Sequence, residues 1–210
     1  ELISIAHPKF RAWLIEEAKK ANLIYSDQAY IPGEKGRYPE ELETYRTLSS
    51  GTRVFFRPIK ISDEQRLQDF LYSLSDNSLY RRFISKRKDL PHERIQEFVV
   101  IDYTKETAIA AIIGDEKTQK IVGMGRYFID ESRHVAEVAF VVRDDHVNRG
   151  IGTELLSYLT YLAKRQGLLG FTADVLAENH PMLHVFEKGG FDIVKRNDAG
   201  VYNLTMTFKK

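Results

Sequence analysis

A loop that could bind an anion joins an expected strand to an expected helix. It ends in Arg149-Gly150-Ile151-Gly152-Thr153, and glycine lets a backbone approach a ligand closely and adopt unusual dihedral angles. The unpaired N–H groups at the start of the helix would point at one spot, where the helix dipole favours negative charge. This chemistry suits a pyrophosphate. A structural turn that simply needs glycine explains the loop, taken alone, about as well.

Several other site chemistries need residues that the sequence lacks. A dinucleotide fingerprint needs a third glycine and an acidic residue about 20 positions later, and a Walker loop needs Gly-Lys-Ser/Thr. The absence of cysteine excludes a disulfide scaffold, a zinc ribbon, an iron–sulfur site and thiol catalysis. His180 and His184 are four residues apart, but without a His-Glu-x-x-His motif a helix cap or a solvated histidine is favoured. We expect no metal.

The pattern of apolar residues predicts the elements that hold this loop. The expected helices cover residues 62–74, 91–100, 148–162 and 181–188. The expected strands cover residues 52–59, 108–114, 121–129, 134–142, 171–177, 191–196 and 200–208. This order describes an α/β (α+β) fold with a mixed, largely antiparallel sheet flanked by helices.

The first fifty residues differ from the rest. Residues 8–21 carry a three/four-spaced apolar stripe that predicts a short amphipathic helix, and residues 27–51 are rich in Gly, Pro, Ser and Glu. We interpret the second segment as a linker with one or two helical turns and place a boundary near Gly51. Because the chain begins at Glu1 without Met, we expect it to be a piece of a longer protein.

The charge balance excludes some partners. Thirty-one Lys and Arg against 30 Asp and Glu give a net charge of +1, whereas nucleic-acid binders and polybasic membrane clamps need a large excess of positive charge. The sequence has no run of eighteen apolar residues that could span a bilayer. We therefore expect a cytoplasmic domain that binds neither nucleic acid nor membrane.

Three motifs together resemble the GNAT superfamily of acyl-CoA-dependent N-acyltransferases. The family's pyrophosphate motif, Arg/Gln-x-x-Gly-x-Gly/Ala, corresponds to residues 147–152, and the family's Asn after the next strand corresponds to Asn179. Residues 186–191 look like the family's Tyr-Glu-Lys-Leu-Gly-Phe helix end. The resemblance covers residues 52–210 and implies a GNAT-like fold with a splay between the two central strands.

Two further resemblances suggest how the chain is organised. Residues 78–83, 102–103 and 136–139 look like the GNAT domain of bacterial protein lysine acetyltransferases. The leader at residues 7–19 is similar to the C-terminal end of the acetyl-CoA hydrolase/transferase family. We therefore expect the tail of a covalently attached CoA transferase-like domain at residues 1–25, a linker at 26–51 and a GNAT acetyltransferase domain at 52–210.

The resemblance implies acetyl-CoA as cosubstrate and assigns the residues that bind it. The implied cofactor-binding residues are Val141, Val142, Arg149, Gly150, Ile151, Gly152, Thr153, Asn179, Met182 and Phe186. The backbone near Val141 and Val142 would face the thioester in the splay. The sequence departs from the family twice: Val147 replaces the Arg/Gln, and Phe186 replaces a Tyr that often protonates the leaving thiolate. We expect His184, a conceivable substitute, to face elsewhere.

The resemblance also places the catalytic glutamate at Glu137. Alternation along the strand puts this residue on the face of Ala139 and Val141. An amine attacks a thioester only as the free base, and a lysine pays about 4.6 kcal/mol at pH 7 to lose its proton. A carboxylate beside the acyl group, directly or through one water, lowers that obstacle. The alternative is a glutamate that pairs with a lysine or arginine across the sheet.

These features predict transfer of acetyl from acetyl-CoA to an amine, most plainly a protein lysine. Two alternatives stay open: a small-molecule amine acceptor, and a regulatory module that senses acetyl-CoA without turnover. Basic residues at 81–82 and 86–88 typically form a solvated face. They could instead steer an acidic protein surface or the 3′-phosphate of CoA.

Overall fold

The computed structural model describes residues 8–21, 23, 38–84, 92–115 and 118–209. Its helices are α2 (Pro8–Lys20), α3 (Glu64–Tyr72), α4 (Asp76–Phe83), α5 (His92–Val99), α6 (Ile151–Arg165) and α7 (His180–Lys188), with short 3₁₀ turns at Glu40–Leu42, Ile61–Asp63 and Asp144–His146. Its strands are β1 (Thr44–Thr47), β2 (Arg53–Pro58), β3 (Glu106–Ile113), β4 (Lys120–Asp130), β5 (Val135–Val142), β6 (Gly170–Leu176), β7 (Asp192–Asp198) and β8 (Val201–Thr207).

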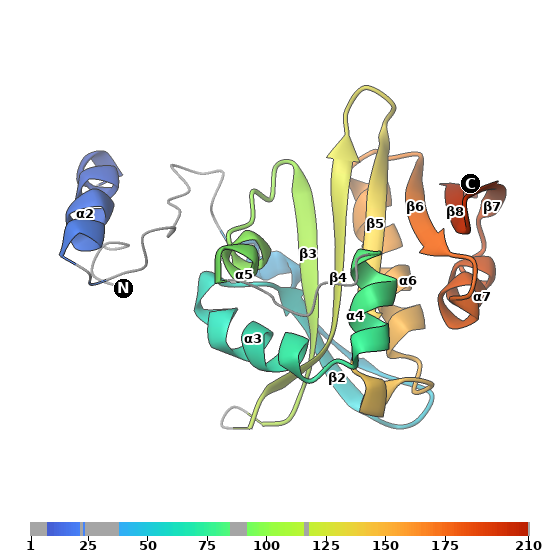
Figure 1. Ribbon diagram of the computed structural model, residues 1–210, viewed down its shortest axis with the longest axis horizontal. Helices are drawn as coiled ribbons and strands as arrows, with labels where there is room; N and C mark the ends of the chain where they lie inside the picture. Colours follow the sequence, from blue (N-terminus) through green and yellow to red (C-terminus); the bar gives the residue numbers. More distant parts are fainter. Residues whose placement is uncertain (1–7, 22, 24–37, 85–91, 116–117, 210) are drawn as a thin grey trace.

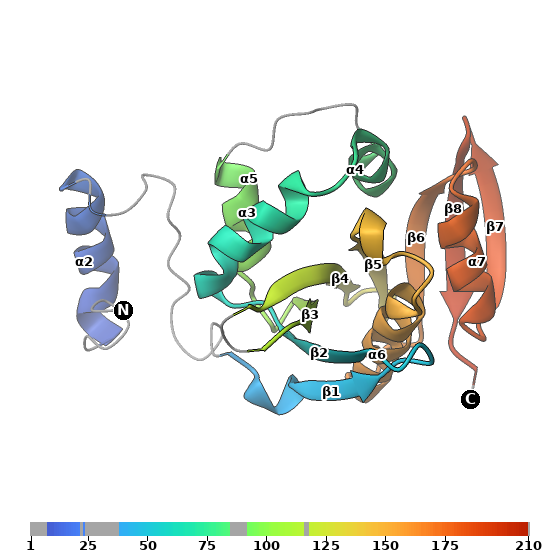
Figure 2. The same ribbon diagram turned by 90° about the horizontal axis from the view of Figure 1, so that it is seen from below.

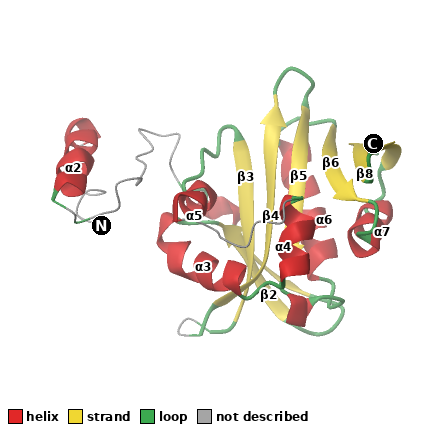
Figure 3. Cartoon of the chain, in the orientation of Figure 1, coloured by secondary structure: helices red, strands yellow, loops and turns green. Residues whose placement is uncertain are grey.

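The strands form one open sheet in the order β1-β2-β3-β4-β5-β6-β8-β7. All neighbours are antiparallel except β5 and β6, so the sheet is mixed and largely antiparallel, as predicted. Helices cover both of its faces (Figures 1 and 3). The expected basic run at 86–88 and the start of the leader lie outside the described residues.

The sheet begins earlier in the chain than the predicted boundary near Gly51. β1 lies within the segment expected to be a linker, and it pairs along its whole length with β2. Contacts from α6 hold it there. Glu154 forms an ion pair with Arg46 of β1 at 2.6 Å. The Tyr158 hydroxyl donates to the carbonyl of Leu42, just before β1, at 2.6 Å. Residues 38–51, all described, therefore belong with the sheet.

Side-chain alternation along β5 separates two apolar cores. Ala136, Val138 and Phe140 belong to the core beneath α6 and α7. Val141 belongs to the opposite core, which α3 and α5 cover. Since alternate residues of a strand share a face, Glu137 and Ala139 point to the same side as Val141.

Close packing of α6 on the sheet depends on glycine in β4. A Cβ at Gly125 would lie 2.7 Å from Leu159 Cδ1, and a Cβ at Gly123 would lie 3.1 Å from atoms of Ile151 and Leu155. A glycine inside a strand marks either a bulge or a close approach of a neighbouring group. The close approach brings the start of α6, at Ile151, against the sheet.

β5 and β6 separate after a short parallel ladder. They pair only at Val135↔Gly170, Ala136↔Phe171 and Glu137↔Thr172, although β5 continues to Val142 and β6 to Leu176. Beyond the ladder β6 stays paired with β8. Figure 1 shows the two strands adjacent where they begin and further apart where they end. The predicted splay is therefore present.

Candidate active site

The loop after β5 presents unpaired N–H groups at the start of α6. Asn148 and Gly150 have positive φ angles of 59° and 87°, which turn the chain sharply into the helix. Glu154 is the first residue of α6 whose N–H reaches a helical carbonyl, that of Gly150 at 3.0 Å. The N–H groups of residues 151–153 precede that first bond, so they are available to an anion at the positive end of a fifteen-residue helix.

A cavity of about 510 Å³ lies against this loop at the end of β5. Most of the predicted cofactor-binding residues line it: Val141, Val142, Gly150, Ile151, Gly152, Thr153, Asn179 and Met182. Asn179 is buried and caps α7, its Oδ1 accepting from the Met182 N–H at 3.4 Å. The structure thus brings together two segments about 30 residues apart in the sequence, with the splay between them.

Three predicted residues lie elsewhere. Arg149 is exposed and does not line the cavity. Phe186 is 1% exposed and packs edge-on against Phe140, with ring centroids 5.4 Å apart, so it belongs to the core. Glu137 is exposed on β5, four residues or about 13 Å before Val141 on the same face.

Helix α4, which the sequence did not predict, forms one wall of the cavity. It lies beside β5 (Figure 2), and Ser78, Arg81 and Arg82 from it line the cavity. Asp144, after β5, fixes the start of α4: it accepts from the Ser75 N–H at 2.8 Å and from the Ser78 hydroxyl at 2.6 Å. Burial alone would raise the pKa of Asp144, but these hydrogen bonds outweigh it and the pKa lies below its usual range.

Charged groups cluster beside this wall. Arg126 and Glu106 form a buried ion pair in which Arg126 Nε donates to Glu106 Oε2 at 2.6 Å. Burial lowers the pKa of the Arg82 guanidinium to about 10; the charge of Arg126 adds to this effect, and the charge of Glu137 opposes it. Arg82 therefore lies within electrostatic reach of both Arg126 and Glu137 and remains charged at neutral pH.

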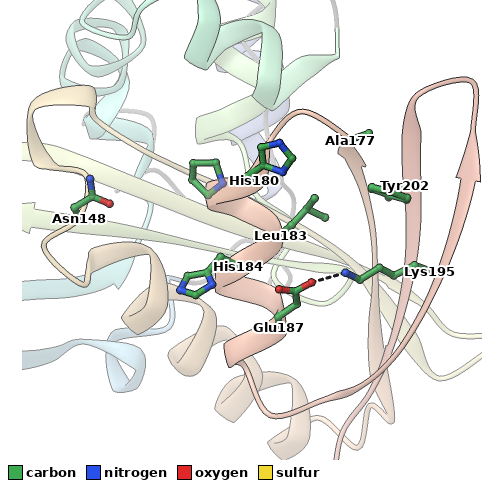
Figure 4. A pocket seen from close by; sticks show the side chains of 9 residues that line it. Asn148, Ala177, His180, Leu183, His184, Glu187, Lys195 and Tyr202 are labelled. Atoms are coloured by element: carbon green, nitrogen blue, oxygen red, sulfur yellow. Dashed lines mark hydrogen bonds and ion pairs between the residues drawn. The ribbon is translucent and has the colours of Figure 1, made fainter.

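A second cavity of about 660 Å³ adjoins the first at the start of α7. The two share Asn148, Pro181 and His184. Figure 4 shows this cavity between α7 and the β7–β8 pair, where Glu187 and Lys195 form an ion pair. His184 lies on the wall of both cavities, on a different side of α7 from the buried Phe186.

The described residues contain no group of three or more His, Cys, Asp or Glu side chains arranged to hold a metal ion. Within the same residues, no helix is long and apolar enough to cross a membrane.

Comparisons with known proteins agree with this geometry. Residues 71–191 match the acetyltransferase (GNAT) family. Acetyltransferase Pat of Mycolicibacterium smegmatis is 32% identical over 162 residues, which cover 72% of this chain and 45% of Pat. The chain therefore spans less than half the length of that relative.

Two solved structures share the fold. The GNAT domain of S. lividans PAT superposes with a TM-score of 0.75 at 29% identity, covering 82% of this chain and all of that domain. PaiA N-acetyltransferase from Thermoplasma acidophilum, solved in complex with coenzyme A, superposes with a TM-score of 0.59 at 17% identity, covering 74% of this chain and 99% of that one. With its family match, sheet order, splay and glycine loop, this chain belongs to the acetyltransferase (GNAT) family.

Proposed function

We propose that this domain transfers acetyl from acetyl-CoA to an amine, with a protein lysine as acceptor and Glu137 as general base. The observation that carries the proposal is the cavity where β5 and β6 separate, between the start of α6 and α7. Acetyl-CoA would supply an activated thioester there. Support also comes from the relatives, which include the acetyltransferase Pat and a fold neighbour solved with coenzyme A.

The residues of the loop fit a pyrophosphate. Besides the N–H groups at the start of α6, Gly152 leaves space at the helix start, since even a Cβ there would only reach ordinary contact, 3.5 Å from Phe140. Arg149, exposed beside the loop, would add positive charge without being needed for the cradle. The second cavity leaves room for the nucleotide beyond the pyrophosphate.

The backbone of β5 offers hydrogen bonds to the pantetheine arm and to the thioester. The Arg143 N–H donates to the Val122 carbonyl of β4 at 2.9 Å. Because N–H groups alternate in direction along a strand, that of Val142 points away from β4 and toward the opening. It is the donor best placed to stabilise the charge that develops on the thioester oxygen.

Glu137 would take the proton from the attacking amine. It lies on the face of β5 opposite to α6, at the last rung of the β5–β6 ladder, so an amine arriving from the α4 side meets it before the thioester. Its separation from Val141 leaves space for the reacting groups or for one bridging water. In this arrangement cosubstrate and acceptor approach the opening from opposite faces of the sheet.

Replacement of the carboxylate tests this role. Glu137→Gln should lower the rate of thiol release with an amine acceptor by about 10²- to 10⁴-fold, the usual contribution of a general base, and leave the Kd for acetyl-CoA unchanged. Glu131→Gln, at an exposed acid in the turn after β4, is the matched control. Equal rates for Glu137→Gln and the parent chain would refute the assignment. Tight binding of acetyl-CoA with no transfer to any amine would instead support a regulatory sensor.

The alternative function, a regulatory sensor without turnover, is supported by Phe186. The ring of Phe186 is buried and carries no hydroxyl that could protonate the leaving thiolate. His184 and His146 line the cavity and could protonate the thiolate instead, as could water.

We also propose that the domain is cytoplasmic and that residues 1–25 are the tail of an attached CoA transferase-like part, an interpretation supported by the leader's sequence. Sequencing the intact gene product tests the attachment.

A further inference from the structure

Two arginines in the cavity wall each carry a buried Nε–H group that makes no hydrogen bond within the described part of the chain. Arg81 and Arg82 are half-buried on α4 and line the cavity. Their Nε atoms are fully buried, and neither makes a hydrogen bond with any described residue. The described residues also provide no ion pair to either guanidinium. A buried donor that stays unpaired is costly, and two adjacent ones in one wall indicate a site that is completed by a ligand.

The position of the two arginines indicates which substrate they would contact. α4 lies on the face of the sheet to which Glu137 and Val141 point, whereas α6, with its anion-binding loop, covers the opposite face. Arg82 also lies within electrostatic reach of Glu137. The arginines are therefore on the side from which the acceptor amine arrives, and the phosphates of the cosubstrate have their own site at the start of α6.

We propose that Arg81 and Arg82 bind a carboxylate carried by the acceptor close to its reacting amine. This proposal rests on the proposed function, since it specifies the acceptor for the same site. A planar guanidinium matches a carboxylate through two parallel hydrogen bonds. The carboxylate comes either from an acidic residue beside the target lysine of a protein or from a small amino acid, and both present the same two groups.

Two nearby carboxylates, those of Asp144 and Glu106, are already engaged elsewhere. The carboxylate of Asp144 accepts hydrogen bonds at the start of α4, one turn before the arginines. Glu106 is paired with Arg126. Within the described residues, Glu137 is the other carboxylate whose charge acts on Arg82, and the structure shows neither a hydrogen bond nor an ion pair between the two side chains. An acceptor carboxylate would therefore enter an electropositive wall.

Matched acceptors test the proposal. One pair is a lysine peptide flanked by Asp and the same peptide flanked by Asn. A second pair is 4-aminobutanoate and 4-aminobutanamide. For the unmodified chain, kcat/KM should be about tenfold or more higher for the carboxylate member of at least one pair, as expected for a charge-assisted hydrogen bond. The pair that responds distinguishes a protein acceptor from a small amino acid.

The selectivity ratio is kcat/KM for the carboxylate acceptor divided by kcat/KM for its neutral partner. The double variant Arg81→Met/Arg82→Met should bring this ratio to about one while the neutral acceptor still reacts. Arg196→Met, at an exposed arginine of β7, should keep the ratio of the parent chain. A ratio near one in the parent chain, or an unchanged ratio in the double variant, overturns the proposal and leaves the acetyl transfer intact. If no amine is acetylated, the proposed function fails, and calorimetric binding of the same acceptor pairs to the CoA-loaded chain still decides whether the arginines select a carboxylate.

Discussion

A charge placed at the start of α6 separates anion binding from helix stability. Thr153 is exposed in the first turn and lines the cavity. A glutamate there favours the helix by about 0.3–1 kcal/mol through the helix dipole. The same carboxylate, about 5 Å from a bound phosphate, would repel it by about 1–3 kcal/mol per charge pair at an effective dielectric between that of water and that of a protein surface. Thr153→Glu should therefore weaken CoA binding about 5- to 150-fold.

Calorimetry with CoA, alongside thermal unfolding of the unliganded chain, measures both effects. Thr153→Glu should unfold at the same temperature as the parent chain or slightly higher, and its loss of affinity should shrink at high salt because screening weakens the repulsion. Thr153→Gln, similar in size but uncharged, should lose at most a few-fold. Ser157→Glu, one turn further along α6, should have a smaller effect. Equal CoA affinity for Thr153→Glu and the parent chain would refute the anion site.

Three further substitutions test stability and its dependence on pH. Asp63→Asn should lower the free energy of unfolding by about 3–5 kcal/mol, because Asp63 is fully buried and binds Arg57 through two hydrogen bonds of 2.6 and 2.7 Å. Gly170→Ala should cost about 3 kcal/mol, since a Cβ there would lie 2.2 Å from the Met206 carbonyl oxygen. Asp144→Ala should cost about 1 kcal/mol at pH 7. Because the pKa of Asp144 is lowered on folding, this contribution is complete above about pH 4 and is lost as the pH falls through the lowered value.

Urea unfolding measures all three losses, and each has a control. Asp69→Asn removes an exposed acid of α3 and should change stability by less than about 0.5 kcal/mol. Gly152→Ala adds a methyl group where only ordinary contacts await it, so a cost equal to that of Gly170→Ala would contradict the packing argument. For Asp144→Ala, a deficit that persists unchanged to pH 2 would contradict the linkage.

The glycine loop was predictable because its chemistry is local. Gly150 needs a positive φ angle and Gly152 stands at a helix start, and both requirements are visible in the sequence. Apolar alternation likewise predicted β3, β4 and β5 to within about two residues at each end. The family resemblance added the splay, which no local pattern encodes, because it depends on where pairing between two distant strands stops.

Two elements that complete the site and the sheet were missed. α4 has no fully buried residue, so it lacks a continuous apolar stripe; a Ser75 cap, Asp76 in the first turn and basic residues in the last turn were the available signals. In β1, half-buried residues alternate with exposed ones and none is fully buried. Contacts from α6 hold this strand in place. In both cases tertiary packing decides a segment whose own pattern is weak.

Amide hydrogen exchange tests the central claim most directly, namely that coenzyme A enters between β5 and β6. Saturating acetyl-CoA should slow exchange in residues 138–142 of β5, with the largest change at Val142, and in residues 150–153 at the start of α6. The edge strand β1 should be unaffected. Unchanged exchange in both segments at a concentration of acetyl-CoA that saturates binding would contradict the account.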